Sequence, residues 1–376
     1  MSVEVVRGPI VKAWKQQEDG RVFVGVRSKH PVAELVRLTE EAVDLLHAEL
    51  LDRGVGVGTV APTSRGVAVV FDHCVDRELL DAALDLIAGH LGEAGVGGRL
   101  SVLSPVWSAV NDLFNPLFGY AAALSLKGSL ADGPVNGELR PRWITDTGVL
   151  DRVIEHALEW CQVPGGEFWV QGGEMSSKVA VGDREALLRA SLHAEPNAKL
   201  VAADGRNNAR QVVFMTSGHV AYSLGGEPAP EWEDAVAVLR DVLVELRSCG
   251  DYGLIQRRHV RGYGGMNVGL WLDLSHNLWS PHRAELIDRA DRAVLGATRL
   301  DHDVERSKVS DVYGIQLLSN DHELPMLPPS WVAEPVGDGM RLVSHREPQR
   351  WFAEEPTFEL LMEARRELSP LLTTDY

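Results

Sequence analysis

Histidines and carboxylates, the side chains best suited to bind metals or move protons, gather in the last third of the sequence. The densest group is Asp301-His302-Asp303. Divalent metals bind oxygen and imidazole ligands, and a histidine beside a carboxylate can act as a general base. Neighbouring residues of a strand point to opposite faces, so only Asp301 and Asp303 would share a site there. We therefore predict no metal site and no cofactor, and keep Asp301, His302 and Asp303 as catalytic candidates for an alternative in which the protein is an enzyme.

The motifs that mark common enzyme classes do not occur in the sequence. It contains no GxxxxGKS or GxxxxGKT phosphate loop, no HExxH motif and no GxSxG motif. The glycine-rich run 54–58 follows a predicted helix and precedes a predicted strand, whereas a phosphate-binding loop needs the opposite order. We interpret Gly54 as the residue that ends the helix.

The cysteines and the distribution of apolar residues indicate where the protein resides. Cys74, Cys161 and Cys249 lie far apart and include no CxxC pair, so neither a disulfide scaffold nor a thiolate zinc site is predicted. This cysteine usage fits a reducing compartment. The sequence shows no signal-peptide core and no apolar run of about 18 residues. We expect a soluble cytoplasmic protein with no membrane partner.

The charge of the chain limits its partners. The 376 residues include 54 acidic and 37 basic side chains, which gives a formal net charge of −17 at pH 7. Nucleic-acid binding depends on a basic surface that neutralises phosphates, so we expect no nucleic-acid partner. A basic or polar protein partner, for example a toxin, suits this charge better.

Two sets of side chains are candidates for contacting such a partner. Trp279 starts a predicted helix and Trp331 follows two prolines in a predicted loop, positions where a large aromatic side chain is hard to bury. The basic stretch 256–265 adds Arg257, Arg258 and Tyr263. Tryptophan, tyrosine and arginine dominate interface hot spots, so we predict partner binding by these five residues. The alternatives are core packing for the tryptophans and ion pairing within the chain for the arginines.

The elements that would position these residues begin with a regular series in the first hundred residues. Hydrophobic patterning predicts strands at 22–26, 55–60, 67–71 and 99–103. It predicts helices at 32–51 and from the N-cap Asp76 to Leu91. The order β-α-β-β-α-β is typical of a ferredoxin-like sandwich with an antiparallel sheet.

A second series of the same kind is predicted after a region that contains Trp107 and Pro116. Strand-like runs occur at 167–172 and 178–181, with a helix at 183–192, strands at 199–203, 211–216 and 219–224, and a final strand at 254–259. The strongest helix opens after Pro230, has an apolar stripe and stops at Cys249-Gly250. The last hundred residues form either a small α+β subdomain or strands that extend the second sheet.

The predicted fold class is therefore α+β, with tandem ferredoxin-like units and a C-terminal α+β extension. The predicted domains are a first ferredoxin-like unit at 1–104, a bridging insertion at 105–164, a second ferredoxin-like unit at 165–261 and the extension at 262–376.

The order of features from about 232 to 371 resembles the C-terminal part of the bacterial type VI toxin-immunity family. The matching features are a long helix ending at 249–253, an aspartate-rich approach at 300–304, strands at 313–318 and 339–343, a polar helix start at 320–322 and a closing helix at 358–372. The layout covers a little over a third of the chain. The resemblance implies a cytoplasmic protein that neutralises a cognate toxin by binding it, without catalytic residues.

Two hypotheses of function follow. In the first, the protein is a non-catalytic binding protein, in its most specific form an immunity protein, whose acidic and tryptophan-bearing surfaces engage a basic partner. In the alternative, it is an enzyme of small-molecule metabolism with a histidine and aspartate site in the C-terminal third or between the two units. A structural subunit of a larger assembly is a third reading of the same features.

Overall fold

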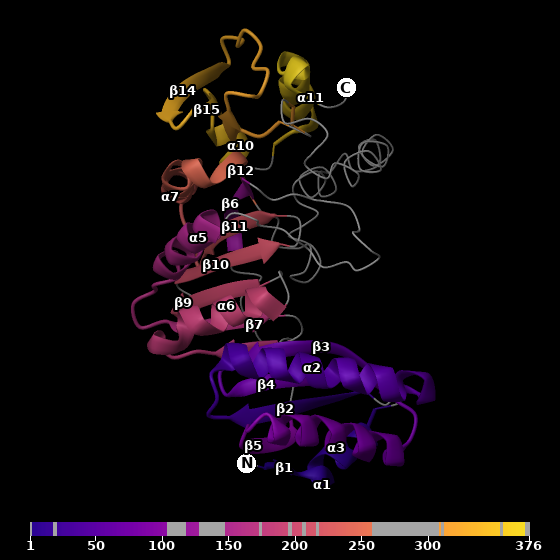
Figure 1. Ribbon diagram of the computed structural model, residues 1–376. Coiled ribbons are helices and arrows are strands. Elements are labelled where there is room, and N and C mark those ends of the chain that lie inside the picture. Colours follow the sequence, from indigo (N-terminus) through magenta and orange to yellow (C-terminus); the bar gives the residue numbers. More distant parts are fainter. Residues whose placement is uncertain are drawn as a thin grey trace. The chain divides into compact units, whose positions relative to one another are not determined.

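The computed structural model describes residues 2–17, 21–103, 118–127, 147–172, 175–194, 198–204, 208–215, 218–257, 308–309, 312–353 and 356–372. The chain divides into two compact units. Unit 1 comprises Met1–Val110 with Phe168–Leu200, and unit 2 comprises Asn111–Glu167 with Val201–Tyr376. Both contain helices and largely antiparallel sheets, so the predicted α+β class is confirmed (Figure 1).

The first 103 residues supply most of unit 1. Its elements there are β1 (Val3–Val5), α1 (Arg7–Trp14), β2 (Val22–Ser28), α2 (Val32–Leu50), β3 (Val55–Thr63), β4 (Gly66–Cys74), α3 (Arg77–Glu93) and β5 (Gly98–Val102). The sheet order is β1-β5-β2-β4-β3. The last four strands pair antiparallel in the order of a ferredoxin-like sheet, and β1 adds a parallel strand beside β5 that the sequence did not predict.

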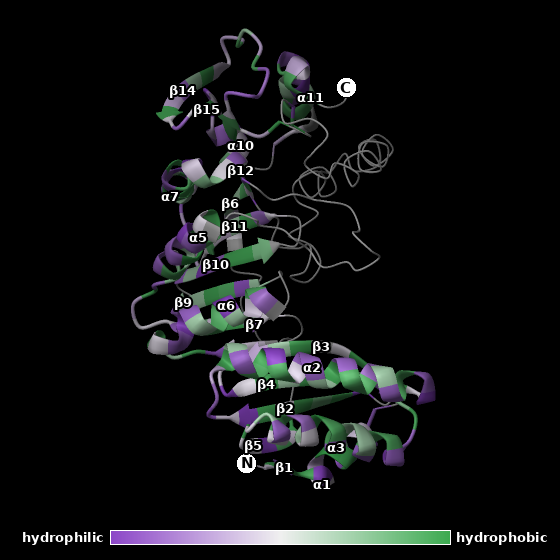
Figure 2. Cartoon of the chain, in the orientation of Figure 1, coloured by the Kyte–Doolittle hydropathy of each residue, from purple (hydrophilic) through white to green (hydrophobic). Residues whose placement is uncertain are grey.

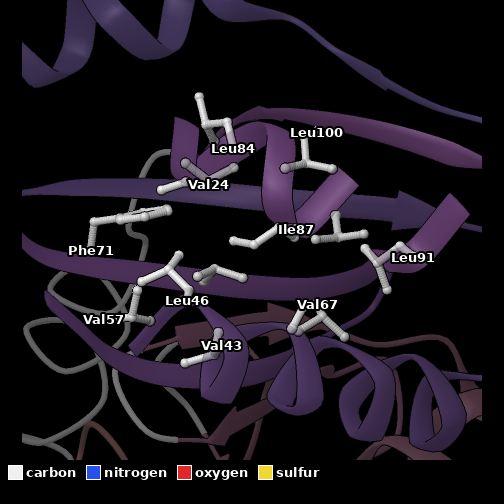
Figure 3. Close-up of a cluster of buried hydrophobic side chains, with 14 of the residues drawn as sticks. Val24, Val43, Leu46, Val57, Val67, Phe71, Leu84, Ile87, Leu91 and Leu100 are labelled. Atoms are coloured by element: carbon white, nitrogen blue, oxygen red, sulfur yellow. The ribbon is translucent and has the colours of Figure 1, made fainter. Parts of the chain in front are cut away.

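Helices α2 and α3 share one hydrophobic core with the sheet of unit 1. The predicted cap is present, because the carboxylate of Asp76 accepts the backbone N–H of Leu79 at 2.8 Å. Leu84, Ile87 and Leu91 on α3 are fully buried (Figure 3). In Figure 2 the strands of this sheet are largely hydrophobic, whereas α2 alternates between hydrophobic and hydrophilic residues, as an amphipathic helix does.

A hairpin and a helix from later in the chain also belong to unit 1. The strands β7 (Glu167–Gly172) and β8 (Met175–Lys178) pair antiparallel, and α6 (Arg184–Ala194) follows. Helix α6 packs against α2 and β3, and β8 lies beside β3. These elements had been assigned from the sequence to a second ferredoxin-like unit.

Unit 2 is built on a long antiparallel sheet. Its elements are β6 (Phe118–Leu126), α5 (Thr147–Trp160), β9 (Ala198–Asp204), β10 (Asn208–Met215), β11 (His219–Gly225), α7 (Trp232–Glu245), β12 (Gly250–Arg257), β13 (Ile315–Ser319), β14 (Trp331–Gly337), β15 (Met340–His345), α10 (Gln349–Phe352) and α11 (Phe358–Glu367). The strand order is β14-β15-β13-β12-β6-β11-β10-β9. The three C-terminal strands thus extend the sheet beyond β12.

The strand order β12-β6-β11-β10 repeats the order β5-β2-β4-β3 of unit 1. Its first strand is β6, which pairs antiparallel with both β11 and β12. The sequence predicts a bridging insertion for this segment and a second unit that begins at 165. The tandem pattern is therefore not confirmed in the form predicted. The run Ala121-Ala122-Ala123 explains the error, because alanine is depleted in strands and gives no strand signal.

Gly54 ends the helical segment of α2 as predicted. Its φ of +102° is left-handed, and β3 begins at the next residue. A Cβ atom added here would also lie 2.7 Å from the Val75 side chain. Both the backbone and the space therefore favour glycine.

Replacing Gly54 by alanine should lower the free energy of unfolding by about 1–2 kcal/mol, because a Cβ atom is strained in the left-handed region. Urea denaturation measures the change. Gly89→Ala is the matched control: Gly89 lies in α3 with no atom within 4 Å of an added Cβ, so alanine there should stabilise by about 0.5–1 kcal/mol. Equal effects at both positions would contradict the conformational argument.

Two buried histidines flank the C-terminal strands. Burial lowers the pKa of His322, whose Nδ1 lies 2.9 Å from the Ser319 hydroxyl. A backbone hydrogen bond with Ser319 and the charge of Asp321 partly oppose the shift, and Arg341 adds to it. Burial likewise lowers the pKa of His345. Over part of the pH range, therefore, both imidazoles are neutral in the folded protein although the same two imidazoles are protonated in the unfolded chain.

The free energy of unfolding should fall as the pH drops below about 6.5, the ordinary histidine pKa, and should stop responding to these groups below their folded pKa values. The sign follows because the unfolded state binds the protons first. His345→Asn should reduce the slope of unfolding free energy against pH between 7.5 and 5. Val332→Ala, at an exposed side chain that does not titrate, is the control and should leave the slope as it is in the wild type. An unchanged slope in His345→Asn would contradict the prediction.

Candidate protein-binding surface

Most of the site residues predicted from the sequence lie outside the described residues. This holds for the partner-binding candidates Trp279, Arg258 and Tyr263 and for the catalytic candidates Asp301, His302 and Asp303. Trp331 and Arg257 are described. Among the residues that the structure describes, no group of three metal-ligating side chains is close enough to hold a metal ion.

Trp331 is a core residue, and the expectation that it is exposed was wrong. Its side chain is 2% exposed, and its indole N–H donates to Glu367 of α11 at 2.8 Å. Its ring meets those of His345 and Trp351 edge to face, at 5.1 and 6.2 Å between centroids. The Ser330 hydroxyl donates to the same carboxylate at 2.9 Å. A carboxylate on α11 thus satisfies the polar end of a tryptophan that starts a strand, which the sequence did not indicate.

Arg257 is half-buried at the end of β12. Its guanidinium donates to the Ala353 carbonyl oxygen at 2.6 Å. Burial raises the pKa of the nearby Tyr120 hydroxyl; the Arg257 charge opposes this shift, and Glu231 and Glu233 add to it. Arg257 therefore lies near the start of α7 and binds another part of its own unit.

Helix α7 has one buried and one exposed face. The predicted stripe of Val236, Leu239 and Leu243 is buried, and α7 packs on β6, β11 and β12. The close approach depends on Gly253 of β12, where an added Cβ would lie 2.9 Å from Leu243. The opposite face and the preceding residue carry the exposed acidic side chains Glu231, Glu233, Asp234, Asp241 and Glu245.

The exposed face of α7 is acidic beyond what the helix itself requires. Carboxylates such as Glu233 and Asp234 in the first turn stabilise a helix through its dipole. Asp241 and Glu245 lie toward the C-terminal end, where the dipole disfavours them. Glu245 lies 3.0 Å from the His156 imidazole of α5. No helix-stabilising role accounts for Asp241.

An ion pair links helix α7 to strand β14. Arg240, the one basic residue of α7, forms an ion pair with Glu334. Val332 stands two residues before Glu334 on the strand and is 40% exposed. Val238 of α7 is 39% exposed and lies on a different side of the helix from Arg240, because helix residues two apart point in nearly opposite directions. Residues two apart on a strand share a face, so Val332 and Glu334 both lie on the side that faces α7.

We call Asp234, Val238, Asp241, Val332 and Glu334 the α7–β14 surface. It has exposed apolar side chains among carboxylates, as a protein-binding patch does. The helical period of the sequence could have predicted the α7 part, since Asp234, Val238 and Asp241 are spaced i, i+4, i+7 opposite the buried stripe. The ion pair between Arg240 and Glu334 depends on the pairing of strands far apart in the chain, which no local pattern predicts.

Comparisons with known proteins leave the family open. No family model matches the chain, and no curated protein matches it. Among solved structures, the chain is similar to the Pseudomonas aeruginosa T6SS protein PA0821 at 12% sequence identity and a TM-score of 0.38, over 68% of this chain and 73% of that one. None of the described helices has the length and apolar character needed to cross a membrane.

Trp331→Ala should lower the free energy of unfolding by about 3–5 kcal/mol, because it leaves a cavity and removes the indole hydrogen bond to Glu367. Guanidinium denaturation measures the loss. The control is the neighbouring exposed Val332→Ala, which should cost less than about 0.5–1 kcal/mol. A small loss for Trp331→Ala would show that its burial does not stabilise this unit.

Proposed function

We propose that this protein acts by binding another protein through the α7–β14 surface, and that the partner presents a basic or polar face. The observation that carries the proposal is the exposed acidic face of α7 with Val238 at its centre, in a chain of net charge −17. Arg240, the only base on that helix, is already paired with Glu334. The surface therefore has unbalanced negative charge available to a partner.

The arrangement suits fast and selective association. A negative face on a negative molecule attracts a basic partner and raises the rate of encounter. Val238 and Val332, each about two-fifths exposed, offer apolar area that a partner can bury. The carboxylates of Asp234 and Asp241 lie on either side of Val238 along the helix and would form the polar rim.

In its most specific form, the proposal is that the protein is a cytoplasmic immunity protein that neutralises a cognate toxin. The layout resemblance of residues 232–371 to the type VI toxin-immunity family supports this form. Elements of that layout are present as α7, β13, β15 and α11. Neutralisation by binding needs a complementary surface and no reacting group, which is what the α7–β14 surface offers.

The charge of the α7 face can be tested directly. The double variant Asp234→Lys with Asp241→Lys should weaken binding to the protein encoded by the adjacent reading frame by at least about tenfold, equivalent to about 1.4 kcal/mol. Calorimetry measures the Kd, and the wild-type affinity should fall with added salt. Coexpression with the adjacent protein tests whether the wild type protects growth and the variant does not.

The matched control is Asp44→Lys with Glu49→Lys on α2 of unit 1. It makes the same change in net charge at two exposed carboxylates outside the proposed surface. It should leave the Kd within about twofold of wild type once salt screens the long-range field. Equal weakening by both double variants would show that total charge, and not this surface, governs binding. No binding by the wild type would overturn the proposal.

A further inference from the structure

Strand β14 is the terminal strand of its sheet, and the hydrogen bonds of β15 show which way its backbone groups point. The N–H of His345 donates to the Gly314 carbonyl, on the β13 side, at 2.9 Å. The N–H of Arg346 donates to Ser330, on the β14 side, at 2.8 Å. Backbone groups alternate between the two sides along an antiparallel strand. In the β14–β15 register, Val332 and Glu334 are therefore the residues that bond to β15.

The backbone groups that point to the open side of β14 therefore belong to Trp331, Ala333 and Pro335. The N–H of Trp331 donates to the Pro328 carbonyl at 3.0 Å, and proline has no N–H. The N–H of Ala333 and the carbonyl oxygens of Trp331, Ala333 and Pro335 remain along this edge of the described sheet. An edge of this kind is a template for an added strand.

The edges of the unit 1 sheet are protected in ways that β14 is not. Strand β1 is only three residues long. Strand β3 carries two register shifts and is contacted by α6 and β8. Strand β14 has seven residues, and its one register shift falls after Pro335, so the backbone around Ala333 is regular. Short, irregular or covered edges resist strand addition, and β14 lacks these features around Ala333.

The side chains beside this edge indicate the chemistry of an added strand. Val332 and Glu334 lie on the same face and are both exposed. A strand added next to β14 would place side chains two residues apart against them: an apolar one beside Val332, and a polar or basic one beside the carboxylate of Glu334, which already pairs with Arg240. A second copy of this chain would bring another charge of −17 and is disfavoured.

We propose that β14 binds an extended, basic segment of the partner protein as an added strand centred on Ala333. This inference rests on the proposed function, because the net charge of −17 supplies the field that attracts the basic segment. Main-chain hydrogen bonds to Ala333 hold the segment, and alternating basic and apolar side chains give selectivity.

The sharpest test is Ala333→Pro. It removes the one outward N–H and blocks strand addition, but it removes no bond to β15, and proline is tolerated on the open side of edge strands. Its thermal midpoint should stay within about 3 °C of wild type, while binding to the protein encoded by the adjacent reading frame should weaken at least about tenfold. Ala333→Val, which keeps the N–H, is the matched control and should retain the wild-type fold and bind within about threefold of it.

Hydrogen exchange gives a second readout on the wild type, since the segment 331–337 should gain protection in the complex. If Ala333→Pro binds the partner tightly while the double variant Asp234→Lys/Asp241→Lys binds it weakly, the added-strand proposal is overturned and the proposed function stands. Loss of a dimer in light scattering on Ala333→Pro, with unchanged partner binding, would assign the edge to a second copy instead. Failure of the wild type to bind would overturn both proposals.

Discussion

The packing of α7 onto the centre of its sheet is the constraint on which the rest of unit 2 depends. It requires small residues beneath the helix, and the sheet supplies them: Ala122 on β6 is fully buried and shares the face of Leu124, and Gly253 on β12 leaves room for Leu243. Larger side chains would lift the helix from the sheet. The same small residues make β6 weak as an isolated strand, so it forms because β11 and β12 pair with it on both sides.

The position of α7 then fixes the chemistry of the surface. Because α7 packs closely against the sheet, the Arg240 side chain forms an ion pair with Glu334 of β14, although α7 and β14 are distant in sequence. This ion pair links α7 to β14 and engages the only base of α7. Exposed ion pairs contribute little to stability, so the main consequence of this pair is that it links the α7 and β14 side chains. Each of the two elements also has an exposed valine, Val238 on α7 and Val332 on β14, that a partner can bury.

The opposite face of the C-terminal strands is organised by burial. Trp331, Trp351 and His345 pack together, and Glu367 from α11 takes the indole hydrogen of Trp331. Neighbouring residues of β14 therefore have opposite roles, because strand side chains alternate between faces. Trp331 anchors the core, and Val332 faces outward. One tryptophan that composition alone suggests as a recognition residue is instead part of what holds β14 in place.

The sequence by itself determined the elements whose signal is local. The amphipathic period of α3, its Asp76 cap and the left-handed Gly54 were all readable, because they depend on neighbouring residues only. The acidic stripe of α7 follows from the same period. Tertiary structure alone decided that β6 is a central strand, that α6 joins unit 1, and that Trp331 is buried. Strand pairing and burial depend on contacts between residues far apart in the chain. Local sequence patterns therefore do not indicate which segment will pair with a strand or bury a side chain.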